Sequence, residues 1–288
     1  MSGPSIVIDT LPRLSRPVFI AGFDGWGNAM DVSSGMADYL IRTLRMTAFA
    51  RLDADRFYRY DGARPRVHIA RGTLKQYTPP GGVFYAAETA EGKRDVVVLR
   101  AHEPSLRWAE FADAVLSLCA DLGVTLIVTL GSMYDSVLHT ERLISGIASD
   151  DDLFGRLAAA DIMPIDYQGP GAVHTVLQTE GQKQGFRCVS LWCHCPFYLE
   201  NTVHYGLLAS LAERLSGLAG LDLPTDALHE GWREVEARIE ALIQEDPEVQ
   251  AVVENLKETE GKGDPPRRPR PAPSGEKVIN LSDFMEPK

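Results

Sequence analysis

The sequence predicts an α/β protein in which strands and helices alternate around a layered sheet. The clearest support is the segment 95–131, where an apolar strand (95–101), an amphipathic helix (105–123) and a second apolar strand (124–131) follow one another. Strand, helix and strand at this spacing form a βαβ unit, which implies parallel strands and a right-handed crossover. A glycine-rich turn between an apolar strand and a helical pattern near the N-terminus supports the same fold class.

The remaining elements follow from hydrophobic periodicity and from turn residues. Apolar residues recur with a helical period over 28–44. In the βαβ unit, Ser105 is the expected N-cap of the helix and Gly123 its end. Further strands are expected at 16–23, 48–53, 66–72, after the turn TPPGG at 78–82, and at 186–195. Further helices are expected at 151–161, 169–185 and 198–218.

The character of the chain changes after Pro224. An apolar stripe on a charged segment predicts a helix, which breaks at Asp246 and restarts with Pro247 at its first position, so we expect a helical hairpin. A Pro/Arg-rich linker then precedes an apolar tail, which is either a docking peptide, for a partner or for the chain's own body, or a disordered end. The predicted division is an N-terminal arm (1–15), an α/β domain (16–222), the helical hairpin (223–260) and the linker with its tail (261–288).

Composition narrows the class of protein. The 288 residues carry 29 Lys and Arg against 40 Asp and Glu, a net charge of −11, which disfavours nucleic acid and anionic membranes as partners. The start of the chain lacks the pattern of a secretory signal, and no apolar run approaches the roughly 20 residues of a spanning helix. The 4 cysteines are too few for a disulfide framework. We therefore expect a cytoplasmic protein.

The turn GFDGWGNAM begins like the dinucleotide fingerprint G-x-G-x-x-G, but Met30 stands where the third glycine belongs. The glycines then serve a tight strand-to-helix turn. A further interpretation is that Asp24, Trp26 and Asn28 line a crevice at the carboxyl end of a strand, where open α/β sheets place their sites.

No other motif is complete. Cys193, His194, Cys195 and His204 resemble a metal site, but the spacing lacks the two paired knuckles of structural zinc sites. We expect neither a metal nor a cofactor, and without a catalytic signature no catalytic residue is assigned. Polar residues after two strands, among them Glu103, could form a pocket or merely salt-bridged loops. The candidate pocket residues are Asp24, Trp26, Asn28, Glu103, His139, Glu141, Tyr167 and Tyr198.

Six stretches occur in a characteristic order and spacing: AGFDGWGNAMDVSSG, FARLDADRFYRYDGARPRV, AHEPSLRWAEFADAV, LGSMYDSVLHTERLISG, YQGPGAVHTVL and CPFYL. Together they resemble the PAC2 family, which is named after the eukaryotic proteasome assembly chaperone and has many bacterial and archaeal members of unknown role. The resemblance covers residues 16–218, with the helical hairpin as a common extension.

The resemblance implies a three-layer α/β/α sandwich similar to the phosphorylase/hydrolase-like fold. It also implies a chaperone or scaffold that acts by contact with protein partners or with itself, as a homo-oligomer such as a trimer. The alternative is a small-molecule binder or enzyme that uses the pocket at the carboxyl ends of the strands. The chain departs from the family pattern in three places: it ends Met-Glu-Pro-Lys instead of a hydrophobic-Tyr-any motif, Phe197 replaces a histidine, and Glu141-Arg142 replaces Arg-Pro.

Overall fold

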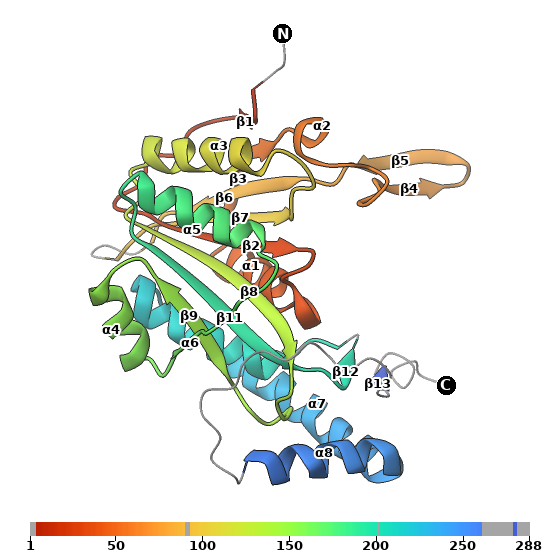
Figure 1. The fold of residues 1–288 in the computed structure, drawn as a ribbon. Helices are drawn as coiled ribbons and strands as arrows, with labels where there is room; N and C mark the ends of the chain where they lie inside the picture. Colours follow the sequence, from red (N-terminus) through yellow and green to blue (C-terminus); the bar gives the residue numbers. More distant parts are fainter. Residues whose placement is uncertain (1–3, 90–92, 201, 261–278, 281–288) are drawn as a thin grey trace.

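A computed structural model describes residues 4–89, 93–200, 202–260 and 279–280. It contains a nine-stranded mixed sheet with helices packed on both faces (Figure 1), which confirms the predicted α/β class. The strand order across the sheet is β1 (Ile6–Ile8), β3 (Thr47–Leu52), β6 (Gly82–Ala87), β7 (Val96–His102), β2 (Val18–Asp24), β8 (Leu126–Asp135), β11 (Cys188–Pro196), β9 (Ile144–Ala148) and β10 (Met163–Pro164).

The centre of the sheet consists of the parallel strands β7, β2, β8 and β11. These strands read as nearly continuous apolar runs because both of their faces are covered. Strands β7 and β8 are joined by helix α3 (Trp108–Asp121), as the βαβ pattern predicts, but β2 lies between them and pairs with both. The two strands of the predicted unit are therefore parallel without pairing directly.

The ends of α3 test two predicted caps. The prediction for Ser105 is wrong: the N-cap is Arg107, and the N–H of Ser105 instead donates to the carbonyl of Phe57 at 2.9 Å. Gly123 does follow the helix end with φ +69°, a backbone conformation that glycine adopts without strain.

Alternate residues of each central strand enter two separate cores. On β2, Val18 and Ile20 pack with helices α1 (Val32–Thr43) and α6 (Tyr205–Ala219), whereas Phe19 and Phe23 pack with α3 and α5 (Val173–Lys183). This alternation is the period-2 geometry of a strand. Helix α4 (Asp151–Ala159) packs beside β9 and adds Leu153 and Leu157 to the first core.

A β-hairpin projects from the body of the molecule (Figure 1). Its strands, β4 (Arg66–Ala70) and β5 (Thr73–Thr78), form a two-stranded antiparallel sheet separate from the main one. The sequence predicts a strand at 66–72 but misses β5, whose residues are all exposed and carry no pattern of one buried face. A short helix, α2 (Ala54–Phe57), precedes the hairpin.

The structure corrects the predicted helix at 198–218. The chain after β11 forms a short strand, β12 (Leu199–Glu200), and α6 begins only at Tyr205, where the Nδ1 atom of His204 accepts the N–H of Leu207 at 3.2 Å. The N-cap is thus a histidine, which the usual cap preferences do not indicate.

Two helices follow, α7 (Asp226–Glu245) and α8 (Pro247–Glu260), and Asp246 Oδ1 accepts the N–H of Glu248 at 3.0 Å, as the Asp-Pro pattern predicts. Helix α7 packs against α6. Of the predicted tail, β13 (Ile279–Asn280) pairs in parallel with β12. The linker and the rest of the tail lie outside the described residues. No helix in the described part of the chain is long and apolar enough to cross a membrane.

Candidate functional site

The first group of candidate residues lies at the carboxyl ends of β2 and β7. Asp24 ends β2, and its Oδ2 atom lies 2.8 Å from Arg100 Nη1 and 3.6 Å from His102 Nε2. Glu103 follows β7 and accepts two backbone N–H groups, from Val173 at 2.9 Å and from Trp26 at 3.4 Å. Asp24 is therefore already engaged by side chains of β7, and Glu103 by the turn after β2 and the start of α5.

The turn after β2 uses its polar residues for structure. Asn28 accepts the N–H of Ser34 at 3.0 Å and donates to Asp31 and to the Ser34 hydroxyl, so it secures the start of α1. The side chain of Trp26, in contrast, is 60% exposed. The close approach of α1 to β2 is made possible by Gly22, where an added Cβ would lie 2.5 Å from the carbonyl oxygen of Ser33. Gly22, inside strand β2, thus allows the close helix–strand packing that the third glycine allows in the dinucleotide fingerprint.

The second group lies in the segment after β8 and beside Tyr198. The Tyr198 hydroxyl accepts the backbone N–H of His139 at 2.8 Å and lies 2.7 Å from Nδ1 of the same histidine. Glu141 Oε2 accepts the N–H of Leu138 at 2.6 Å. Burial lowers the pKa of His139 to about 4 and raises the pKa of Tyr198, so both side chains are neutral near pH 7.

The N-cap of α6 and helix α7 bring to this second group residues that are absent from the candidate pocket residues. The rings of His204 and Trp232 stack with centroids 3.9 Å apart, and Arg142 lies over the Trp232 ring at 4.7 Å. Arg142 also pairs with Glu236 on α7, with a distance of 3.6 Å between Nη2 and Oε1. The apolar stripe on the charged segment predicts that α7 packs through one face. It does not predict that Trp232 stacks on His204, because this contact depends on the tertiary fold.

Tyr167 stands apart from both groups. It is exposed, and its hydroxyl donates to the carbonyl of Pro170 at 3.1 Å within the same loop. The structure therefore places Asp24 next to Glu103 at the carboxyl ends of β2 and β7. It places His139 next to Tyr198 in the second group.

The four residues that resemble a metal site point to different partners. Cys193 and Cys195 belong to the core beneath α6, whereas His194 bonds to Asp135, and His204 caps α6. Within the ranges that the structure describes, no group of three or more His, Cys, Asp or Glu side chains is placed to hold a metal ion.

One hydrogen-bonded chain of side chains has no signature in the sequence. His194 Nδ1 lies 2.8 Å from Asp135 Oδ2, and His194 Nε2 lies 2.9 Å from Ser145 Oγ, which is the bonding order of a Ser-His-Asp triad. The three residues are only 4%, 2% and 1% exposed, respectively. A nucleophile needs an accessible oxygen, so we interpret this chain as a satisfied internal network that joins β8, β9 and β11.

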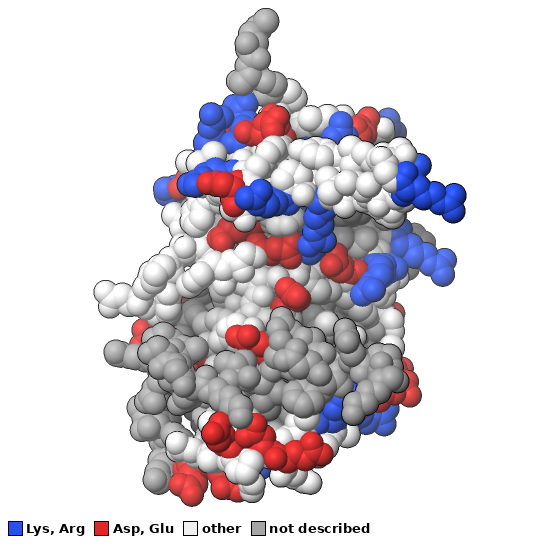
Figure 2. All heavy atoms as spheres, turned by 90° about the vertical axis from the view of Figure 1, so that its right-hand side faces the viewer, with Lys and Arg blue, Asp and Glu red and all other residues white. Residues whose placement is uncertain are grey.

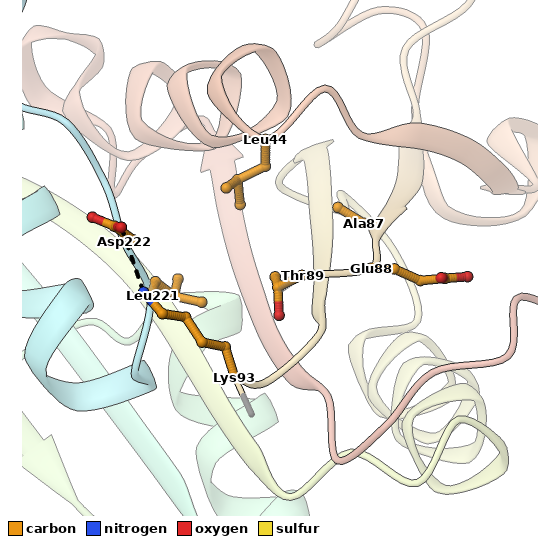
Figure 3. A pocket seen from close by; sticks show the side chains of 7 residues that line it. All are labelled: Leu44, Ala87, Glu88, Thr89, Lys93, Leu221 and Asp222. Carbon is orange, nitrogen blue, oxygen red and sulfur yellow. Dashed lines mark ion pairs between the residues drawn. The ribbon is translucent and has the colours of Figure 1, made fainter. Parts of the chain in front are cut away.

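A pocket lies at the opposite end of the central strands (Figure 3). It encloses about 180 Å³, below the roughly 300–1,000 Å³ of typical ligand pockets. Across it Lys93 reaches toward Asp222, with 3.5 Å between the charged atoms. None of the candidate residues lines it; the lining residues are Leu44, Ala87, Glu88, Thr89, Lys93, Leu221 and Asp222.

These features define a mixed α/β protein with two polar clusters near the carboxyl ends of its parallel strands and a pair of C-terminal helices. The sequence model of the PAC2 family matches residues 19–243, and the chain belongs to the PAC2 family. No curated protein matches the sequence.

Several solved structures are similar. A PAC2 family protein from Streptomyces avermitilis is 31% identical, with a TM-score of 0.73 over 82% of this chain and 99% of that one. A Mycobacterium tuberculosis protein of unknown function, Rv2714, is 25% identical, with a TM-score of 0.80 over 91% and 90%. A proteasome-assembly chaperone homologue from the same organism, Rv2125, is 24% identical, with a TM-score of 0.74 over 82% and 99%.

Proposed function

We propose that the chain is an assembly chaperone or scaffold that acts by protein–protein contact and that associates with copies of itself. Family membership supports this proposal, because one structural relative is described as a proteasome-assembly chaperone homologue. Another, PbaB from Pyrococcus furiosus, is described as an archaeal proteasome activator; it is 19% identical, with a TM-score of 0.64 over 82% of this chain and 97% of that one.

The projecting β4–β5 hairpin is the observation that carries the proposal. Val67 lies opposite Tyr77 and Ile69 opposite Leu74, so cross-strand pairing places the four apolar side chains on one face. Each of the four is between 55% and 62% exposed. An isolated two-stranded hairpin is marginal in water, and an exposed apolar face on such a hairpin is typical of a surface that another protein covers.

Charge favours a second copy of this chain as one such partner. The stretch 62–87 contains no Asp or Glu but carries Arg64, Arg66, Arg71 and Lys75, although the whole chain has a net charge of −11. Figure 2 looks onto the end from which the hairpin extends, and Asp and Glu side chains gather across the middle of this face. A basic, apolar hairpin of one copy is complementary to the acidic face of another.

Light scattering tests the self-association. The double variant Val67→Ser/Ile69→Ser should reduce the mass in solution to that of a monomer. The matched control is Ile8→Ser/Leu11→Ser, which removes two aliphatic side chains of similar exposure, 45% and 44%, far from the hairpin. A monomeric wild-type chain, or an unchanged mass in the hairpin variant, would contradict this part of the proposal.

Capture from native lysate tests the assembly role. The wild-type chain should retain a heterologous protein that the hairpin variant Val67→Ser/Ile69→Ser does not retain, because the same exposed face is expected to contact partners. Recovery of nothing but further copies of the chain would argue against an assembly factor and leave a self-associating protein of another kind.

A further inference from the structure

Where the start of α6 packs against α7, three buried nitrogen atoms have no hydrogen-bond partner among the residues that the structure describes. They are Nε2 of His139, Nε2 of His204 and Nε1 of Trp232, in residues that are 4%, 0% and 4% exposed. Native proteins satisfy nearly all of their buried polar atoms, and each exception requires an explanation such as a bound water or ion. Three exceptions among neighbouring residues indicate a missing acceptor.

The three atoms are hydrogen-bond donors. Because Nδ1 of His204 accepts the N–H of Leu207, the neutral ring carries its proton on Nε2. The Tyr198 hydroxyl accepts the backbone N–H of His139, and we assign its own proton to the bond with Nδ1, which places the His139 proton on Nε2 as well. The indole nitrogen of Trp232 can only donate. Burial lowers the pKa of both histidines, which keeps the rings neutral.

Arg142 supplies a positive charge to the same cluster. It lies over the Trp232 ring, which in turn stacks on His204, and its Nη1 atom donates to the carbonyl of His139 at 2.8 Å. An added Cβ at Gly206 would collide with the guanidinium, so the first turn of α6 holds Arg142 in place from the other side. The side chains of His139, His204, Trp232 and Arg142 therefore all present hydrogen-bond donors.

The carboxylate of Glu236, which pairs with Arg142, is held loosely. Glu236 Oε1 lies 3.6 Å from Arg142 Nη2, which is longer than a hydrogen bond. The side chains of Arg142 and Glu236 are 24% and 27% exposed, so this pair forms the solvent-facing edge of the cluster. When the Glu236 carboxylate turns into solvent, it leaves the charge of Arg142 and the donors, while Lys257 of α8 acts on His139 without contacting it. One charge in direct contact matches a single negative charge better than a double one.

We propose that His204, Trp232 and Arg142, with His139, bind the carboxylate of an organic acid, which takes the place of the Glu236 carboxylate. A carboxylate accepts several hydrogen bonds and carries one negative charge, as this cluster requires. Such a group is supplied either by a small free acid or by the C-terminus of a polypeptide. The site is independent of the hairpin and of the proposed assembly role.

Thermal unfolding of the full chain at pH 7.5 tests the site. At constant ionic strength maintained with NaCl, sodium acetate and sodium propionate should raise the melting temperature with a saturable dependence on concentration, because ligands of the folded state stabilise it. Acetamide, which lacks the charge, should not raise the melting temperature. Inorganic phosphate should need an at least about tenfold higher concentration than acetate for the same rise. A short peptide with a free C-terminus, compared with its amidated form, distinguishes a polypeptide end from a small acid.

Variants make the test specific to the cluster. Trp232→Phe keeps an aromatic ring but removes the indole N–H, and Arg142→Gln removes the charge; each should raise the half-saturating acetate concentration at least about tenfold. Glu236→Gln changes only a partly exposed group and should lower the half-saturating acetate concentration, because the competing carboxylate is gone. Arg51→Gln, at an exposed ion pair with Asp9, is the matched control and should behave as wild type. The proposal is overturned if no carboxylate shifts the melting temperature, or if Glu236→Gln and Trp232→Phe leave the half-saturating concentration unchanged.

Discussion

Glu103 accepts the backbone N–H of Val173 at 2.9 Å, although the two residues are 70 positions apart in the sequence. Val173 opens helix α5, and the N-cap residue of this helix is Ala172, which has no side-chain acceptor. The carboxylate of Glu103 therefore serves as a distant cap for α5 and places a negative charge at the positive end of the helix dipole.

Replacement of Glu103 by Ala should lower the free energy of unfolding by about 1–2 kcal/mol, because the cap and its charge are lost together. Urea unfolding measures the change. Glu240→Ala, at an exposed position on α7, is the control and should change the value by less than about 0.5 kcal/mol. Equal effects of the two substitutions would show that Glu103 does not secure α5.

Gly22 should tolerate no side chain. A Cβ at this position would lie 2.5 Å from the carbonyl oxygen of Ser33 and 2.8 Å from Cβ of Ala37, so Gly22→Ala should force α1 away from β2 and cost about 1–3 kcal/mol. Gly155→Ala is the matched control, because Gly155 lies within α4 and an added Cβ has nothing within 4 Å. The control should stabilise the protein by roughly 0.5–1 kcal/mol, since alanine favours helix. Chemical denaturation that shows both variants to be neutral would refute the close-packing argument.

Local features of the sequence predicted local structure well. The apolar run of β2, the glycine after α3 and the Asp246-Pro247 start of α8 each depend on neighbouring residues, so periodicity and cap chemistry are sufficient to find them. The order of the strands could not be predicted in this way. The position of β2 between β7 and β8 depends on which buried strands pair with each other, and an apolar pattern indicates that a strand is buried but not which strand it pairs with.

The polar clusters illustrate the same limit. Position after a strand was enough to select His139 as a candidate, but nothing near it in the sequence indicates Trp232 or Glu236, which α7 brings to the cluster. Likewise, His194 contacts Asp135 at a separation of 59 residues and Ser145 at 49. Such contacts form only when the strands pair in register, so the sequence alone does not predict them.

Acid should destabilise the protein through His174. Its ring is buried, and its Nε2 atom lies 2.7 Å from the carbonyl oxygen of Leu130, while Nδ1 has no hydrogen-bond partner among the described residues. Burial lowers the pKa of this ring from 6.5 to about 4. The unfolded chain therefore binds more protons than the folded one between these values. The stability from the neutral ring is fully present above pH 6.5 and is lost as the pH falls toward 4, by about 3 kcal/mol for this group.

Urea unfolding at several pH values from 7 to 4 measures this dependence. His174→Asn should make the profile less steep, because asparagine does not titrate in this range, whereas the buried His139 and His204 keep their contributions. His229→Asn is the control: this histidine is exposed on α7, and its removal should leave the slope nearly as in wild type. Parallel profiles for wild type and His174→Asn would contradict the assignment.

Tyr198→Phe should destabilise the fold more than any comparable tyrosine change at the surface. The Tyr198 hydroxyl is the acceptor for the backbone N–H of His139 and the partner of its Nδ1, and both residues are buried. Its removal leaves these groups without water or protein to bond, at a cost of about 1–3 kcal/mol. The control is Tyr167→Phe, which removes an exposed hydroxyl bonded to Pro170 and should cost less than about 0.5 kcal/mol. Should both variants unfold at the same urea concentration as wild type, the hydroxyl of Tyr198 would not be the group that holds the segment after β8 against β11.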